Sequence, residues 1–324
     1  AEYMGTNIYV TGPAEVRSCN LQRITFHPHW LPMEDRISPP LQSLHQPSVR
    51  HFLLAFFFIA VFFFLRFFLD KFVFNRLSLL LTHKPTLSKS KPGKTTKATI
   101  EKCSESLWKL SYYVTVESFV LWIIHAEPWL RDLPQCFFNW PNHELREPLK
   151  VYYMCQFGFY LYSIVALLMW ETRRKDFAVM MSHHIITSLL IGVSYILTFF
   201  RIGAIILALH DASDVFMEMA KIFKYANNEL GASLAFGMFS LSWLILRLFY
   251  FPFWVIRASS CDMLKHLDFS STYMTFVYYM FNTMLIMLLV FHMYWWLLIC
   301  SMIMKQLRNR GKVEKDIRSD SEDD

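Results

Sequence analysis

The chain has 324 residues, of which 54% are hydrophobic and only 18% are charged, and it carries 31 Phe, 15 Tyr and 10 Trp. Soluble globular domains contain about 25% charged residues, and here the charges gather in short stretches between long apolar runs. That pattern is typical of a chain whose solvent is lipid. The net charge of +6 does not indicate nucleic-acid binding, because the basic residues flank apolar runs, where membrane topology accounts for them.

Seven segments are long and apolar enough to approach the roughly 20 residues that cross the hydrocarbon core of a bilayer. The second of them is the least apolar, because it contains Glu117, His125 and Glu127, and the sixth has Arg247 inside it. We therefore predict an all-α polytopic membrane protein with about seven transmembrane helices. The predicted spans are His51–Leu69, Tyr112–Leu130, Val151–Trp170, Phe177–Phe200, a segment that begins at Ile202 and turns polar after Leu209, Leu230–Ile256 and Phe269–Met304.

The distribution of Lys and Arg predicts the orientation of these spans. With seven crossings, the loops and ends on one side of the membrane hold 20 basic residues and those on the other side hold 10. Basic residues are enriched on the cytosolic side, so the loop of residues 70–111 and the C-terminus are expected in the cytosol and the N-terminus in the lumen. Cys136 and Cys261 would then share the oxidising side, where they could pair.

Three segments outside the spans have a composition of their own. Residues 1–50 form a polar, Pro-rich N-terminal extension with no assigned role, and residues 71–101 are expected to be a basic cytosolic linker. Residues 305–324 form a cytosolic tail with an acidic end. Ser319 and Ser321 in that tail each have an acidic residue three positions on, which suits an acid-directed kinase as well as a simple solubilising end.

The fourth predicted span carries two adjacent histidines, His183 and His184. A titratable side chain inside a membrane span is costly, so it is expected to line a cavity and to have a function. Adjacent helical residues lie about 100° apart, so the two imidazoles cannot both point straight at one spot. One is expected to reach a substrate while the other bonds across helices or orients its neighbour. A purely structural pair of hydrogen-bonding histidines is the alternative.

A second polar cluster, His210-Asp211-x-x-Asp214, follows the apolar start of the fifth span. At helical spacing His210 and Asp214 share a face, and Asp211 lies three residues from Asp214. Two carboxylates and an imidazole within one turn form a surface suited to proton transfer or cation binding. The short connection around Arg201 makes the fourth and fifth spans antiparallel neighbours, so the two clusters are expected to contribute to one site. A solvated helix end is the alternative for this cluster.

The residues leave two chemistries open. Di-iron desaturases and hydroxylases need several histidine boxes, and membrane prenyltransferases need a second Asp-rich motif; the sequence has neither. A zinc hydrolase built from His210, Asp214 and one of the paired histidines is sterically feasible, since His and Asp are good zinc ligands. Acyl transfer assisted by an imidazole needs only a histidine near a carbonyl and an acid to orient or charge it.

The run from Trp170 to Tyr225 resembles the Lag1 motif of ceramide synthases, within the TRAM–Lag1–CLN8 (TLC) superfamily, and its wording is closest to the plant members. It reads WETRRKDFAVMMSHHIITSLLIGVSYILTFFRIGAIILALHDASDVFMEMAKIFKY. Supporting matches are FLRFFLDKFVF from residue 64, KCSESLWKLSYY from residue 102 and LRLFYFPFWVIRASS from residue 246. The resemblance implies a TLC domain over residues 102–304, preceded by a first transmembrane helix at 51–70, with six helices forming a barrel around a lipid tunnel.

The resemblance also implies a function, which is N-acylation of a sphingoid base, sphinganine or phytosphingosine, by fatty acyl-CoA in the endoplasmic reticulum membrane. By motif position, His183, His184, Asp211 and Asp214 correspond to the essential residues of the family, with His210 in a supporting place. The implied partners are acyl-CoA as co-substrate, the sphingoid base and membrane lipid, with no nucleic acid; a homo- or hetero-oligomer is compatible with the sequence. No metal or other cofactor is expected. The alternatives are a zinc-dependent, ceramidase-like lipid amidase and a non-enzymatic TLC protein that handles lipids.

Overall fold

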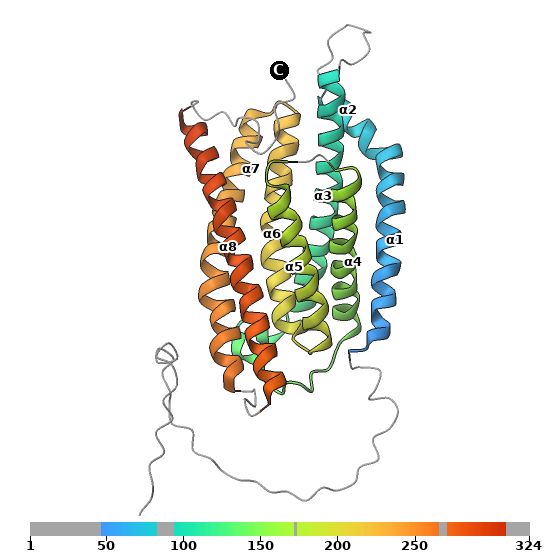
Figure 1. The fold of residues 1–324 in the computed structure, drawn as a ribbon. Coiled ribbons are helices and arrows are strands. Elements are labelled where there is room, and N and C mark those ends of the chain that lie inside the picture. Colours follow the sequence, from blue (N-terminus) through green and yellow to red (C-terminus); the bar gives the residue numbers. More distant parts are fainter. Residues whose placement is uncertain (1–46, 83–93, 172–173, 266–270, 309–324) are drawn as a thin grey trace, which may run out of the picture. The chain divides into compact units, whose positions relative to one another are not determined.

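The computed structural model describes residues 47–82, 94–171, 174–265 and 271–308. Every regular element in these ranges is helical, which confirms the predicted all-α class. The α-helices are α1 (Phe52–Leu69), α2 (Asn75–Thr82), α3 (Lys94–Ile124), α4 (Glu147–Met169), α5 (Phe177–Ile196), α6 (Phe200–Tyr225), α7 (Glu229–Ser242) and α8 (Thr272–Arg308). Successive long helices run in opposite directions (Figure 1).

Short helical turns of other types join or extend these helices. Single 3-10 turns lie at Val49–His51, Pro128–Leu130, Leu133–Cys136 and Met263–Lys265, and π-helical stretches lie at Asp70–Phe74, Trp243–Ile256 and Ala258–Asp262. The stretch Trp243–Ile256 continues α7 and contains Pro252. A proline inside a helix cannot donate the usual backbone hydrogen bond and crowds the preceding turn, which accounts for the change from α- to π-helical bonding there.

Six helical segments among the described residues are long and apolar enough to cross a membrane, which makes the chain a multi-pass membrane protein. They are Val49–Thr82, Lys97–Ile124, Glu147–Met169, Phe177–Ile196, Glu229–Lys265 and Thr272–Arg308. The fifth predicted span, which begins at Ile202, corresponds to α6, which has 26 residues but is not among the six. Its second half is too polar, because it carries the His210–Asp214 cluster, Glu218 and two lysines.

Six helices form a closed ring, as expected for the barrel. In the order α3, α4, α5, α8, α7, α6, each helix contacts the next, and α6 in turn contacts α3; α8 contacts α7 through the π-helical stretch Trp243–Ile256 that continues α7. Helix α1 lies outside the ring against α4 (Figure 1). The two helices come close together at Gly158 of α4, where an added Cβ would lie 2.8 Å from the carbonyl oxygen of Ala55. Small residues permit such close contact between membrane helices.

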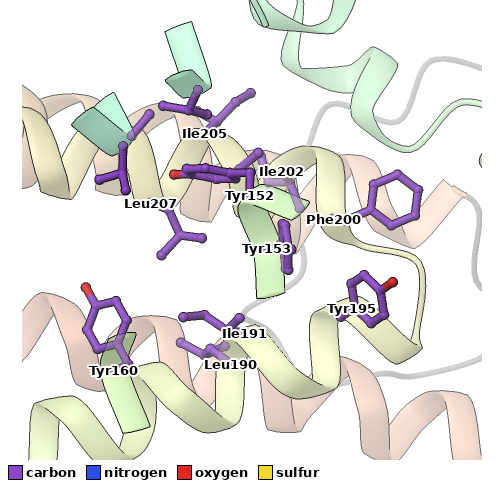
Figure 2. Close-up of a cluster of buried hydrophobic side chains, with 14 of the residues drawn as sticks. Tyr152, Tyr153, Tyr160, Leu190, Ile191, Tyr195, Phe200, Ile202, Ile205 and Leu207 are labelled. Atoms are coloured by element: carbon purple, nitrogen blue, oxygen red, sulfur yellow. The ribbon is translucent and has the colours of Figure 1, made fainter. Parts of the chain in front are cut away.

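The core between α4, α5 and α6 is rich in tyrosine (Figure 2). Lipid tails are as apolar as the side chains that pack together, so helix association in a membrane depends on close packing and on hydrogen bonds between helices. Tyr153 of α4 and Ser194 of α5 bond through their hydroxyl groups at 3.2 Å. The Tyr112 hydroxyl of α3 donates to Gln156 of α4 at 2.8 Å. The outward faces carry apolar side chains such as Phe64 and Leu297, which are at least 70% exposed.

The structure corrects the predicted second span and the predicted linker. The helix expected at Tyr112–Leu130 is α3, which begins at Lys94 and ends at Ile124. The linker expected over residues 71–101 is helical up to Thr82 and again from Lys94, and the residues between lie outside the described ranges. The Lys, Ser and Thr residues of this segment are typical of a solvated linker. The helix that starts within it is nevertheless packed against the first span, because Ser104 of α3 donates to Asp70 and the carbonyl of Ser104 accepts a bond from Arg66 at 3.2 Å.

Two further predictions concern the segments outside the spans. Cys136 is buried with a free thiol, whereas Cys261 is disulfide-bonded, so the pairing that a shared side of the membrane would permit does not form between these two cysteines. Burial raises the pKa of the Cys136 thiol to about 12. Helix α8 extends to Arg308, so the tail expected from residue 305 begins as helix. Ser319 and Ser321 lie outside the described residues, as does the N-terminal extension up to residue 46.

Candidate active site

The paired histidines border a cavity inside the ring of helices. His183 and His184 lie in the second turn of α5, with their Nδ1 atoms 3.4 Å apart and their ring planes inclined by 52°. His183 is buried and packs edge-on against Trp295 of α8, and His184 packs edge-on against Tyr160 of α4. Although the two rings diverge, as helical spacing requires, both line the same cavity.

The cavity, of about 130 Å³, extends from the α4–α5 connection to the histidine pair. Its wall near the connection is charged and its remaining wall is apolar and aromatic. The charged and histidine side chains that line it are Glu105, Lys109, Glu171, Arg174, Asp176, His183, His184, Asp214, Glu218, Lys221 and Arg247. Lys109 donates to Glu105 at 2.7 Å and to Glu171 at 3.0 Å. Burial raises the pKa of the Glu171 carboxyl, and the ammonium of Lys109 opposes that shift.

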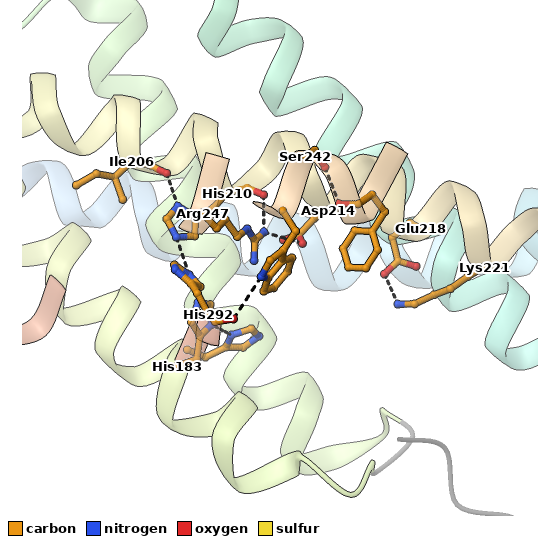
Figure 3. A network of polar contacts seen from close by, with 12 residues as sticks. His183, Ile206, His210, Asp214, Glu218, Lys221, Ser242, Arg247 and His292 are labelled. Atoms are coloured by element: carbon orange, nitrogen blue, oxygen red, sulfur yellow. Dashed lines mark hydrogen bonds and ion pairs between the residues drawn. The ribbon is translucent and has the colours of Figure 1, made fainter. Parts of the chain in front are cut away.

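Asp214 reaches the cavity as part of a buried ion pair. Arg247, from the π-helical stretch after α7, donates from Nη2 to Asp214 at 2.7 Å and to the backbone carbonyl of His210 at 2.6 Å (Figure 3). The guanidinium also lies 4.0 Å from the ring centroid of Trp243, one turn earlier. A charge buried inside a membrane bundle requires such a partner. Arg247 therefore holds the carboxylate at the cavity wall and links α6 to the π-helical stretch after α7.

His210 faces a different partner from the one expected. Its Nε2 lies 2.9 Å from Nε2 of His292 on α8, and its Nδ1 lies 2.5 Å from the carbonyl oxygen of Ile206 (Figure 3). The indole of Trp243 donates to the carbonyl of His292 at 3.3 Å. Neither His210 nor His292 lines the cavity. This second histidine pair therefore links α6 to α8 in the wall behind the site.

Asp211 and Asp214 are separated, although they lie three residues apart on α6. Asp211 is 1% exposed, does not line the cavity and accepts a hydrogen bond from Gln156 of α4. Gln156 also donates to the hydroxyl of Tyr152 at 3.1 Å. Of the two predicted carboxylates, Asp214 therefore borders the cavity together with the paired histidines, while Asp211 connects α6 to α4.

Three residues of the site were not predicted as such, namely Gln156, Arg247 and His292. Each is a polar side chain within an otherwise apolar span, which is the signal that singled out the paired histidines. In the sequence, Arg247 stands out only as an interruption of the sixth span. His292 and Gln156 carry no such signal, because each is a single polar residue in a long apolar run and belongs to no motif.

The structure does not bring together the residues of the zinc site that the sequence left open as an alternative. Among the described residues, no group of three or more His, Cys, Asp and Glu side chains could hold a metal ion. His210 bonds to His292, and Asp214 bonds to Arg247, so neither converges with the paired histidines as a third ligand.

A second, mostly apolar cavity of about 50 Å³ lies further along the inner face of α5. Thr187, one turn after His183, borders it together with Ile191 and Ser194, and Leu285 and Leu288 of α8 border it from the other side. The described residues thus line two cavities in succession along one helix, one charged and one apolar. These two cavities have no described lining residue in common, so they do not by themselves form the expected continuous tunnel.

The fold and the site together define a polytopic helical membrane protein with a charged, histidine-lined cavity inside its helical ring. The TRAM–LAG1–CLN8 family model, described as the TLC domain, matches residues 102–301. The chain belongs to the TLC domain family.

The relatives of the chain include named ceramide synthases. It is 60% identical over 276 residues to ceramide synthase LOH2 of Arabidopsis thaliana, covering 85% of this chain and 93% of that protein. It is 62% identical over 227 residues to ASC1-like protein 3 of Oryza sativa subsp. japonica, covering 70% and 80% of the two chains. Ceramide synthase 4 of Mus musculus is 38% identical over 225 residues, which cover 69% of this chain and 55% of that protein.

Proposed function

We propose that this protein is a ceramide synthase, an acyltransferase that joins the acyl group of a fatty acyl-CoA to the amino group of a sphingoid base, sphinganine or phytosphingosine. The observation that carries the proposal is the pair His183–His184 at the wall of an internal cavity that also exposes Asp214. The names of the relatives, several of which are ceramide synthases, select acyl transfer from the chemistries that a histidine and an acid support.

Two reaction routes fit this geometry. In the first, an imidazole nitrogen of His183 attacks the thioester carbonyl, the C–S bond breaks, and CoA leaves as the thiolate. The amine then attacks the acyl-imidazole, a C–N bond to the amine forms, the bond to the imidazole breaks, and the imidazole leaves with the proton that the amine nitrogen loses. In the second route, the amine attacks the thioester directly, a C–N bond forms, the C–S bond breaks and CoA leaves as the thiolate, and His183 takes the proton that the nitrogen loses. An acyl-imidazole is reactive toward amines, and a cavity that excludes water protects it from hydrolysis.

The neighbouring residues have distinct roles in this proposal. Asp214, held by Arg247, supplies a fixed negative charge beside the histidines and stabilises the imidazolium that forms when a histidine takes a proton. His184 lies against the His183 ring and limits its orientation. Asp211 acts at a distance, by holding α6 to α4 through Gln156, and His210 holds α6 to α8 through His292. The apolar second cavity, along the same face of α5, provides room for hydrocarbon.

The proposed location is the endoplasmic reticulum membrane, with the N-terminus in the lumen and the C-terminus in the cytosol. The excess of Lys and Arg on one side of the predicted spans supports this orientation. The charged cavity lies at the end of the ring formed by the α4–α5 connection and by the C-terminus of α8, so CoA would approach it from the cytosol (Figure 1). Cytosolic labelling of cysteines introduced at residues 305–308, and luminal labelling at residues 131–146, would support this topology.

The decisive experiment combines the purified protein with an acyl-CoA and a long-chain sphingoid base, and detects the N-acyl product by mass spectrometry. Ceramide formation that depends on both substrates supports the proposal. Cleavage of added ceramide without synthesis would favour a lipid amidase. Unchanged activity in His183→Ala and His184→Ala would remove the basis of the site and favour a TLC protein that only handles lipids.

A further inference from the structure

Glu218 is a carboxylate of the charged cavity that has no role in the proposed reaction. Glu218 lies on α6 one turn beyond Asp214, lines the cavity and is 1% exposed. Lys221 donates to its Oε1 at 2.6 Å, while Oε2 is buried and has no hydrogen-bond partner among the described residues (Figure 3). A buried carboxylate oxygen that accepts no hydrogen bond is costly, so its retention inside a cavity indicates a ligand that donates to it.

The charges around the cavity indicate the sign of that ligand. Five carboxylates but only four Lys and Arg side chains line it, and they form pairs. Asp214 pairs with Arg247, and Glu105 and Glu171 share Lys109. With neutral histidines and ionised carboxylates, the described residues of the wall carry a formal charge of −1, which in a buried cavity favours an additional monovalent cation.

The rest of the wall indicates the form of the cation. Apolar side chains line the cavity around the charged residues, among them Phe159, Leu167, Phe177, Phe239 and Leu298. A small hydrated ion gains nothing from such a surface, whereas a cation that carries a hydrocarbon chain can bury its chain against it. The carboxylate and the apolar wall together fit an amphiphilic ammonium ion.

We propose that Glu218 is the binding group for the ammonium of the long-chain amine acceptor, and that its Oε2 accepts a hydrogen bond from that nitrogen. This inference rests on the proposed function and adds a residue for recognition of the amine. Glu218 follows Asp214 by four residues on α6, a rise of about 6 Å, so the proposed binding group and the Asp214–Arg247 ion pair lie about one helical turn apart along a cavity that the paired histidines also line.

The test compares Glu218→Gln with the wild type, using an exposed glutamate as the control. Glu218→Gln keeps the size of the side chain and removes its charge, so the apparent KM for the sphingoid base should rise while that for acyl-CoA stays unchanged. A hydrogen bond to a charged group corresponds to about a ten- to a hundredfold change in affinity. Glu229→Gln, which removes the half-exposed partner of Lys224, should behave as wild type. An unchanged apparent KM for the base in Glu218→Gln would overturn the proposal.

Two inhibitors separate recognition of the charge from catalysis. N,N-dimethylsphinganine keeps a protonated nitrogen but cannot form an amide, and its analogue with a hydroxyl in place of the amino group is neutral. Wild type should prefer the cation, and Glu218→Gln should lose that preference. Lys221→Gln removes the cation beside Glu218 and should strengthen the preference instead. If Glu218→Gln does not accumulate as folded protein, Lys221→Gln decides, and an unchanged or weaker preference overturns the proposal.

These experiments distinguish failure of the role proposed for Glu218 from failure of the proposed function. If wild type makes no ceramide, the proposed function fails. Binding of the two inhibitors is then still measured by the shift of the melting temperature in detergent. If wild type makes ceramide but the two inhibitors bind Glu218→Gln and wild type with the same ratio, only the role of Glu218 fails.

Discussion

The two histidine pairs of this protein have the same composition but different surroundings. His183 and His184 lie side by side on one helix, and both face the charged cavity. His210 and His292 come from helices α6 and α8, bond to each other and do not line the cavity. A histidine in a membrane span can thus serve either the reaction or the packing of the helices. The pair at the cavity can meet a substrate, whereas the pair in the wall satisfies its own hydrogen bonds and holds two helices together.

The largest expected effect comes from removing the imidazole at the cavity. His183→Ala should abolish ceramide formation if His183 is an obligate nucleophile, whereas loss of a general base alone costs about 10²–10⁴ in rate. Intact-protein mass spectrometry after exposure to acyl-CoA without amine separates the two routes. A mass increase of one acyl group that is absent in His183→Ala supports the covalent route. The melting temperature in detergent should stay near wild type, because the His183 ring packs against Trp295 of α8 but has no hydrogen bond to another helix among the described residues.

The next largest effect is expected from the ion pair between the two histidine pairs. Arg247→Met leaves Asp214 as a buried, unpaired carboxylate, which costs about 3–5 kcal/mol when one partner of a buried pair is removed. Asp214→Asn combined with Arg247→Met should regain part of that loss, because no charge then remains unpaired. Melting temperatures of the three proteins in one detergent measure the effect. A double variant less stable than Arg247→Met would show that the pair is not the source of the cost.

Local composition predicts most of the spans and, of the cavity residues, His183, His184 and Asp214, because a titratable side chain in an apolar run stands out in the sequence. Long apolar runs predict membrane helices, and a charged or titratable residue within them predicts a site. The start of α3 was missed because its stability is not local. The polar residues from Lys94 onward resemble a linker, yet the helix is held by contacts with residues some 35 positions earlier, such as Ser104 with Asp70.

The partners within the site were not predictable for the same reason. Asp211 and Asp214 belong to one motif, but which of them faces the cavity depends on the rotation of α6 relative to α4 and α7. That rotation is set by Gln156 and Arg247, which are 55 and 33 residues away from their respective partners. The bond between His210 and His292 spans 82 residues. The spacing within a motif predicts which residues share a face of the helix. Which side chains of other helices that face contacts depends on the packing of the whole bundle.

A smaller effect is expected from the histidine pair in the wall. His292→Phe leaves Nε2 of His210 buried without its partner, and an unsatisfied buried polar group costs about 1–3 kcal/mol. Folding stability should fall while ceramide formation per folded molecule changes little, which is the reverse of His183→Ala. His210→Phe and His292→Phe should be less than additive in a double-mutant cycle. Additive effects would show that the two rings do not stabilise the fold through each other, and loss of activity in stable His292→Phe protein would place this pair in the reaction rather than in the wall.

The smallest effect is expected from chelators, which test whether either histidine pair serves a metal. The side chains that would complete a zinc site with the cavity pair are already engaged, since Asp214 bonds to Arg247 and His210 bonds to His292. A tetrahedral zinc site needs three or four converging ligands, and the described residues bring no such group together. EDTA and phenanthroline should therefore leave ceramide formation unchanged. Chelator-sensitive cleavage of ceramide by protein that contains stoichiometric zinc would contradict this prediction. His183 and His184 would then be zinc ligands in a hydrolase. His210 or Asp214 would have to move toward them when the metal binds.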